Sequence, residues 1–203
     1  EAAVGLNHGW IEMTAYRTAH AEGRLPVRTY ATLMGDKTRS ILPEAMAAGL
    51  VTGAGDDRLR IGGVKIFTDG STGGRTAAMT RPYLGGGADD RGILCIPDDA
   101  ELAKMVLEAH RCGWQMAVHA IGDRAIDQVL DAYAAAQAAL PAPERRHRIE
   151  HCGWLPADQL ERMRELRVVP APQPTFMYYF GDLYLSLVEA DRVAAAYPMR
   201  RWL

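Results

Sequence analysis

Cysteine is scarce in this sequence, and its placement argues against two classes of site. The 203 residues contain only Cys95, Cys112 and Cys152, which lie far apart and form no CxxC pair. An odd number of widely spaced cysteines argues against a disulfide framework and against a thiolate zinc site. We therefore expect small buried thiols in a reducing compartment, and a cytoplasmic protein. The sequence starts at Glu1 rather than Met, so the natural start is expected upstream.

Long apolar runs and clusters of basic residues are also missing. No window approaches the roughly 20 consecutive apolar residues that a membrane span needs. The formal net charge is −2, and the basic residues are nowhere more clustered than in ERR at 144–146. The electrostatic footprint of a nucleic-acid binder is therefore absent. We therefore expect neither nucleic acid nor a membrane as a partner. The composition of 48% hydrophobic and 24% charged residues predicts a globular protein with a hydrophobic core.

No GxGxxG turn opens a helix, which argues against a doubly wound nucleotide-binding sheet. Instead, helical and strand patterns alternate, as in an α/β protein with parallel strands. The predicted strands are residues 27–33, 62–69, 115–120, 147–152 and 168–173, with 2–6 as a weaker sixth. The predicted helices are residues 41–51, 98–113, 123–141, 157–166 and 189–203, with Asp98 or Asp99 and then Asp123 placed as N-terminal caps.

Repeated βα units of this length favour a (β/α)₈ barrel. With five to six strands, the chain is expected to form part of such a barrel, a single partial domain over residues 1–203 that lacks the first and last strands. Residues 70–92 hold seven glycines and little apolar periodicity, which predicts a long loop of the kind that is often functional. An opened barrel exposes unpaired strand edges, so we expect pairing with another copy, a homo-oligomer, if nothing is missing from the molecule.

Two predicted strands end in a histidine. His119 lies in QMAVHA and His151 in HRIEHC, each as the next-to-last residue. Since the carboxyl ends of parallel strands meet at one edge of a sheet, both imidazoles are expected at one barrel mouth, each on a face shared with an apolar residue such as Ile149. Two neutral imidazoles suit a borderline metal such as zinc. A single strand histidine is more often a hydrogen-bonded core residue, and that alternative stays open.

Lys65 is a third unusual residue, because GGVKIF places a long cation in a strand that should be buried. An unpaired buried ammonium is costly, so something must neutralise it. A salt bridge to Asp69 or an extended side chain that reaches solvent would suffice. A buried lysine with a lowered pKa can also take up carbon dioxide and become an anionic carbamate that binds metal.

Four segments together carry a resemblance to a known family. GGVKIFTDGSTGGRTAAMTRPY, QMAVHAIGDRAID, RHRIEHC and VVPAPQPTFMYYFGDLY resemble the amidohydrolase superfamily, and within it amidohydrolase family 3, the branch that includes N-substituted formamide deformylase. The resemblance implies a metal-dependent hydrolase on a (β/α)₈ barrel. It places Lys65 at the fourth-strand ligand position, His119 at the fifth and His151 at the sixth.

The sequence also departs from the family pattern. It has no HxH pair, since His8 and His20 stand alone, and no strand-end aspartate after its last predicted strand. The resemblance therefore implies that the catalytic aspartate lies beyond Leu203. Among the other polar residues, Asp69 and Arg124 are candidate partners of the metal ligands. Asp69 could equally pair with Lys65 or Arg75, and Arg124 could be an ordinary surface helix arginine.

Two functional hypotheses follow. The first is a metal-dependent hydrolase that cleaves a non-peptide C–N bond of a small molecule, in which a metal-activated water attacks an amide-type carbonyl. The cofactor would be a divalent ion, with zinc expected, and Lys65 would act either as the amine or as a carbamate. The alternative is a non-catalytic binding or regulatory protein that keeps the barrel frame without a complete metal site. The aromatic cluster of Tyr178, Tyr179 and Phe180 could wall a substrate pocket or simply pack.

Overall fold

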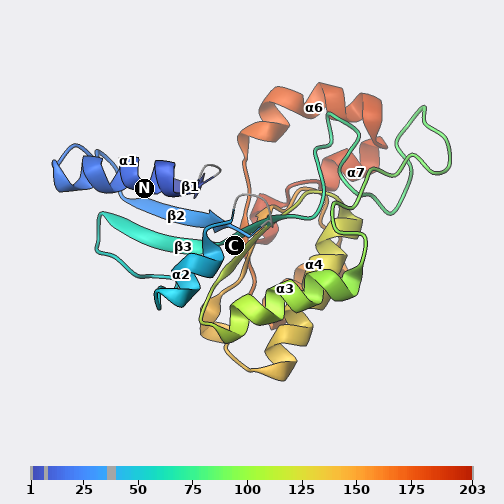
Figure 1. The fold of residues 1–203 in the computed structure, drawn as a ribbon. Coiled ribbons are helices and arrows are strands. Elements are labelled where there is room, and N and C mark those ends of the chain that lie inside the picture. Colours follow the sequence, from blue (N-terminus) through green and yellow to red (C-terminus); the bar gives the residue numbers. More distant parts are fainter. Residues whose placement is uncertain (1, 7–8, 36–39, 203) are drawn as a thin grey trace. The chain divides into compact units, whose positions relative to one another are not determined.

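The chain folds as an α/β protein, as the alternating patterns predict. The computed structural model describes residues 2–6, 9–35 and 40–202. The elements are β1 (Ala2–Leu6), α1 (Trp10–Ala21), β2 (Thr29–Met34), α2 (Leu42–Ala47), β3 (Leu59–Phe67), α3 (Asp99–Arg111), β4 (Met116–Ala120), α4 (Asp123–Ala139), β5 (Arg148–His151), α5 (Ala157–Glu165), β6 (Val169–Ala171), α6 (Thr175–Leu187) and α7 (Ala190–Ala195), with 3₁₀ turns at Pro143–Arg145 and Met199–Arg201 (Figure 1).

The chain divides into two compact units. Unit 1 holds residues 1–66 and 108–117, and unit 2 holds residues 67–107 and 118–203. The strands follow chain order. β1, β2 and β3 up to Ile66 belong to the first unit, and β4 from Val118 on, β5 and β6 belong to the second. All predicted strands are present, 2–6 included. That residues 1–203 form one barrel domain stays a prediction.

The helix predictions were less accurate at two places. The sequence patterns did not indicate α1, in which Met13 is the buried residue, or α6, whose apolar side chains surround the whole helix instead of forming one stripe. The helix predicted over 189–203 was wrong in its length. It ends at Ala195, because a proline at 198 cannot continue a helix, and a single 3₁₀ turn follows.

Unit 1 is built on parallel strands whose register contains a bulge. Ala31 pairs with Ile61, but Leu33 pairs with Val64, so β3 carries one extra residue at Gly62–Gly63. The bulge falls on two glycines because there is no room for side chains: a Cβ on Gly62 would lie 2.9 Å from the Ala31 carbonyl oxygen. The extra residue reverses the alternation of side chains along the rest of β3.

The bulge decides which way Lys65 faces. Leu59 on one side of it and Val64 and Ile66 on the other are all buried, so they share the helix-covered face of the strand. Lys65 is half-buried and lies on the opposite face. In an uninterrupted strand, Lys65 would point into the apolar layer between the sheet and the helices. The extra residue turns it to the other face.

Unit 2 buries apolar side chains of α4, and a core cluster includes residues of α6 and α7. Helix α4 packs beside α5, and α6 beside α7 (Figure 1). The loop of residues 70–92 forms neither helix nor strand, as predicted, yet part of it is buried. Its Ala77, Met79 and Tyr83 are buried in one apolar cluster with Trp154 and residues of α6 and α7.

A buried carboxylate holds this loop against β4. The Asp69 side chain is completely buried, and its Oδ2 accepts hydrogen bonds from the backbone N–H groups of Ala78 (2.9 Å) and Gly122 (2.8 Å), while its Oδ1 accepts one from Ile121 (3.0 Å). Thr68 adds a hydroxyl bond of 2.6 Å to the His119 carbonyl. The start of the loop and the end of β4 are thereby fixed to each other.

Close backbone contact at Gly122 completes this junction. A Cβ at this position would lie 1.9 Å from the Ala78 carbonyl oxygen and 2.4 Å from its carbonyl carbon. Both atoms are backbone, so they cannot rotate away as a flexible side chain could. Only glycine allows the loop and the first turn of α4 to approach this closely.

None of the helices in the described part of the chain is both long enough and apolar enough to cross a membrane.

We predict that Gly122→Ala lowers the free energy of unfolding by about 3 kcal/mol, because the added methyl forces two backbone segments apart. The matched control is Gly181→Ala in α6, where a Cβ meets no atom within 4 Å. That change should be neutral or stabilise by up to about 1 kcal/mol through helix propensity. Urea unfolding followed by circular dichroism measures both, and equal stabilities of the two variants would contradict the crowding argument.

We also predict that Asp69→Asn destabilises the protein by about 3 kcal/mol, because an amide NH₂ group would face buried N–H donors that need an acceptor. Asp127→Asn is the control, since Asp127 is half-exposed and pairs with Arg162 at the surface. Its replacement should cost less than about 1 kcal/mol. The same denaturant titration compares them, and a small loss for Asp69→Asn would show that the loop is held by other contacts.

Candidate functional site

The two strand-end histidines lie against each other in unit 2. His119 is the penultimate residue of β4 and His151 the last of β5. Their ring centroids are 4.5 Å apart, and the rings meet edge to face at 69°. Neighbouring parallel strands that end at the same level bring both imidazoles to one point.

His119 is held by hydrogen bonds at one ring nitrogen only. Its Nε2 lies 2.8 Å from the Gly70 carbonyl oxygen and 3.2 Å from Asp69 Oδ1. A carbonyl can only accept, so Nε2 carries the hydrogen and, in the neutral ring, Nδ1 carries the lone pair. Nδ1 is buried and has no hydrogen-bond partner in the part of the chain that the structure describes. A buried lone pair without a donor suits a metal ion.

His151 is held by a different kind of contact. Its Nδ1 makes a short hydrogen bond with Oε1 of Gln173, a residue just after β6. The amide oxygen accepts, so Nδ1 is the protonated nitrogen and the lone pair of the neutral ring lies on Nε2. The sequence reasoning missed Gln173, and only its position after a strand could have indicated it.

The backbone at His151 is strained. His151 has φ 71° and the next residue, Cys152, has φ 50°, both in the left-handed region that residues other than glycine seldom adopt. The left-handed backbone interrupts regular strand geometry at His151, so the expectation that Ile149 and His151 share one strand face stays a prediction. Such conformations cost about 1–3 kcal/mol each and cluster at functional sites.

Aromatic rings extend the histidine pair on both sides. The Phe67 ring lies 5.0 Å from that of His119, and Phe176 stacks on His151 at 5.7 Å and 14°. Phe180 follows, with its ring 5.7 Å from that of Phe176. Phe67 and Phe180 are each a little over two-fifths exposed. The imidazoles thus sit in a row of rings that offers an apolar surface.

The cluster predicted at residues 178–180 does not act as one unit. Tyr178 and Tyr179 are 84% and 71% exposed, so they neither pack in the core nor line a pocket. Only Phe180 joins the row of rings beside the histidines. The reason is helical: side chains at consecutive positions of α6 point in different directions.

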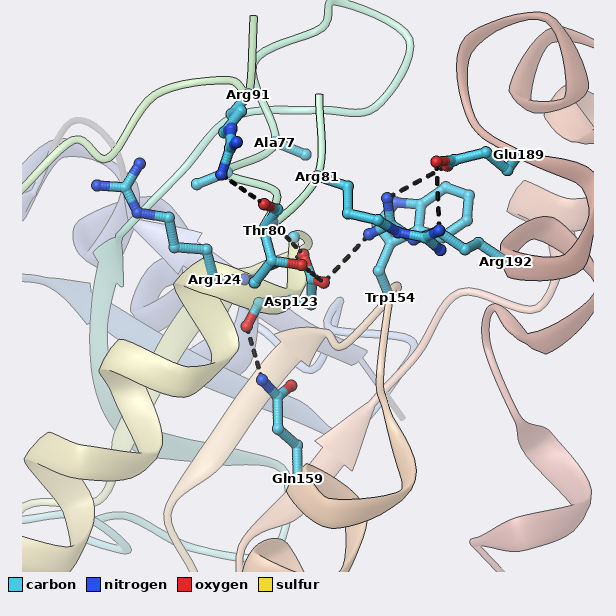
Figure 2. A network of polar contacts seen from close by, with 12 residues as sticks. Ala77, Thr80, Arg81, Arg91, Asp123, Arg124, Trp154, Gln159, Glu189 and Arg192 are labelled. Carbon is cyan, nitrogen blue, oxygen red and sulfur yellow. Dashed lines mark hydrogen bonds and ion pairs between the residues drawn. The ribbon is translucent and has the colours of Figure 1, made fainter. Parts of the chain in front are cut away.

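Asp123 is the centre of a second polar network near this edge of β4 (Figure 2). It is the first residue of α4 rather than its N-cap, which is Gly122, so the predicted capping role was wrong. Its Oδ1 accepts the Thr80 N–H at 2.8 Å, and its Oδ2 accepts the Thr80 hydroxyl and Arg192 Nη2. The carboxylate therefore links the glycine-rich loop to α7.

Arg192 is the buried cation of this network. Its side chain is 11% exposed, with Nη2 3.1 Å from Asp123 and Nη1 3.5 Å from Glu189. Its guanidinium also lies over the Trp154 ring at 5.8 Å (Figure 2). The Trp154 indole N–H donates to Thr72 Oγ1 at 2.8 Å. The network places the Arg192 guanidinium beside two carboxylates and joins α7 to Trp154, three residues after His151.

The remaining predicted site residues have separate locations. Asp69 contacts His119 directly, while Arg75, the other partner considered for it, pairs with Asp90. The Arg124 side chain is exposed on the first turn of α4, which favours the surface-arginine interpretation. Lys65 belongs to unit 1, whereas the two histidines belong to unit 2.

The donor atoms in unit 2 fit part of a metal site. Two neutral imidazoles are suitable ligands for a borderline divalent ion, and each has its other ring nitrogen oriented by a neighbouring group. Among the described residues, however, no group of three or more His, Cys, Asp or Glu side chains could hold a metal ion. The pair therefore supplies two ligands, and further ones must be of another type or come from elsewhere.

Known proteins resemble this chain over most of its length. Residues 1–203 match the amidohydrolase family. The chain is 37% identical over 134 residues to Protein LONG AFTER FAR-RED 3 of Arabidopsis thaliana, which covers 66% of this chain and 23% of that protein. It is 29% identical over 193 residues to YtcJ of Bacillus subtilis, a protein named as an amidohydrolase, covering 94% of this chain and 34% of YtcJ.

Two solved structures share the fold. Uncharacterized metal-dependent hydrolases from Pyrococcus furiosus and Pyrococcus horikoshii each match with a TM-score of 0.79, at 34% and 31% identity, over 98% of this chain and 38% of theirs. This likeness agrees with an α/β fold that forms part of a barrel. The chain thus spans between 23% and 38% of the length of these relatives. Because the family match extends over every residue, the chain belongs to the amidohydrolase family.

Proposed function

We propose that this chain carries part of the metal site of a hydrolase that cleaves a non-peptide C–N bond, of the amide type, in a small molecule. The observation that carries the proposal is the His119–His151 pair, in which the buried Nδ1 of His119 has no hydrogen-bond partner among the described residues. Family membership and the metal-dependent hydrolases among the structural relatives support it.

In this proposal His119 binds the metal through Nδ1 and His151 through its own ring. Lys65 is a third ligand on the strength of the sequence resemblance, either as the amine or as a carbamate. Zinc is the expected ion, since it favours imidazole ligands. When bound, the metal would lower the pKa of a water molecule and polarise the substrate carbonyl.

The other residues of the site orient these ligands. Gly70 and Asp69 fix the His119 tautomer through Nε2, and Gln173 fixes His151 through Nδ1. Partners of this kind raise the affinity of a site for its metal, because the ligand rings need not be ordered at the moment of binding. Phe67 and Phe180 would contact an apolar part of the substrate and exclude water from it. A closer relation to N-substituted formamide deformylases is part of this proposal.

A non-catalytic binding protein is the second candidate. The observation that favours it is the absence of any metal-holding group of three His, Cys, Asp or Glu side chains in the described part of the chain. Such a protein would keep the barrel frame and the apolar ring surface and would bind a small molecule without hydrolysing it. Metal binding separates the two candidates.

We predict that the purified chain, dialysed against zinc and then against metal-free buffer, retains close to one ion per chain. His119→Ala and His151→Ala should each lower zinc affinity by at least about tenfold, because each removes one ligand. His20→Ala is the control, since His20 lies in unit 1 and pairs with Asp56. Elemental analysis and competition with a chelator give these quantities. A wild-type chain that takes up no zinc would favour the binding-protein candidate.

We further predict that Lys65 is carboxylated when zinc is bound. Protein loaded with zinc in ¹³C-bicarbonate should show a carbamate carbon resonance that Lys65→Arg abolishes, because a guanidinium does not form the carbamate. Lys104→Arg in α3 is the control and should leave the signal in place. A zinc-loaded protein without this resonance would leave Lys65 as an amine and limit the proposed site to the histidines.

A further inference from the structure

Unit 1 contains an apolar cavity that the proposed hydrolase function does not use. Its volume is about 360 Å³, and it lies between α1, α2 and the strands β2 and β3. The apolar wall includes Trp10, Met13, Leu33, Ile41 and Leu59. Voids larger than a water molecule are rare in packed cores, whereas ligand pockets begin at about 300 Å³. The space is therefore of ligand size.

The cavity is on the helix-covered side of the sheet. Leu59 and Ile61 of β3 line it, and the bulge at Gly62–Gly63 turns Lys65 to the other face of that strand. The cavity is thus separated from the one proposed metal ligand in this unit. Binding there would need neither metal nor the histidine pair.

One end of the cavity is polar, and the carboxylate there, that of Asp56, already has hydrogen-bond partners of its own. His20 Nε2 lies 2.7 Å from Asp56 Oδ2, and Asp56 Oδ1 accepts the N–H groups of Arg58 (2.8 Å) and Leu59 (3.1 Å). These backbone hydrogen bonds, together with His20, lower the pKa of Asp56 to about 2. The Asp56 carboxylate is therefore ionised at neutral pH and occupied by its own neighbours.

Arg17 precedes His20 by about one helical turn on α1, so it lies at the same end of the cavity. It lines the cavity from α1, and its side chain is exposed. Arg24, the next arginine along the chain, pairs with Glu22, but no carboxylate among the described residues pairs with Arg17. An apolar cavity with an unpaired guanidinium at its polar end is complementary to a molecule with an apolar body and one negative group.

We propose that this cavity binds a small carboxylic acid with an apolar body. The apolar part lies against Trp10, Leu33 and Leu59, and the carboxylate accepts hydrogen bonds from the Arg17 guanidinium. A neutral molecule of the same shape would fill the cavity but leave Arg17 without a partner. A cation of the same shape would meet Arg17 with like charge.

Three linear eight-carbon probes with different head groups test this proposal on the metal-free 203-residue chain. They are octanoate, 1-octanol and octylammonium. Binding is followed by ¹⁹F NMR of protein labelled with 5-fluorotryptophan, in which the Trp10 signal is assigned by its loss in Trp10→Phe. Octanoate should shift the Trp10 signal and bind about tenfold more tightly than 1-octanol, with octylammonium the weakest.

Two substitutions separate the charge from the cavity. Arg17→Gln should weaken octanoate about tenfold and change 1-octanol less than twofold, while Arg24→Gln should alter neither. Ala45→Phe places a ring in the cavity and should abolish binding of both probes, with circular dichroism to show that the variant folds. Equal affinities for octanoate and 1-octanol, equal effects of the two arginine variants, or an unmoved Trp10 signal would each overturn the proposal. None of these outcomes depends on zinc binding.

Discussion

The site in unit 2 depends on one buried carboxylate. Asp69 accepts three backbone N–H groups, from Ala78, Ile121 and Gly122, and its Oδ1 lies 3.2 Å from His119 Nε2. A buried charge is tolerated only when its lone pairs are satisfied, and here the donors come from two distant segments of the chain. The same contacts that stabilise the charge therefore join the loop of residues 70–92 to the end of β4 and orient the imidazole.

Beside the histidine pair, an unfavourable backbone conformation is held in place by hydrogen bonds. His151 and Cys152 both adopt left-handed backbone conformations, which is unfavourable for residues with side chains. The surroundings hold them there: the Cys152 N–H donates to the Ala120 carbonyl at 3.1 Å, and Gln173 contacts the His151 ring. Only a well-packed neighbourhood can impose such a conformation, and here it lies directly beside the contact between His151 and His119.

In each unit, a strand departs from regular geometry at a proposed metal ligand. In unit 1 an extra residue in β3 turns Lys65 away from the apolar layer, and in unit 2 a left-handed residue ends β5 at a histidine. Both are interruptions of regular strand geometry at a polar residue. In β3, regular alternation would have sent Lys65 into an apolar environment, where a charge is costly.

The sequence by itself determined the α/β class, the six strands, the long glycine-rich loop and the location of both histidines at strand ends, because hydrophobic periodicity and turn residues are local signals. Helix α6 was not predicted, because its apolar residues surround the helix and do not form the single stripe that indicates an amphipathic helix. Tertiary structure alone decided that Asp123 binds Thr80 and Arg192 instead of capping α4, that Gln173 meets His151, and that an apolar cavity opens between α1 and β3. These features depend on residues far apart in the chain, and their distances in space are set by packing, which no local pattern encodes.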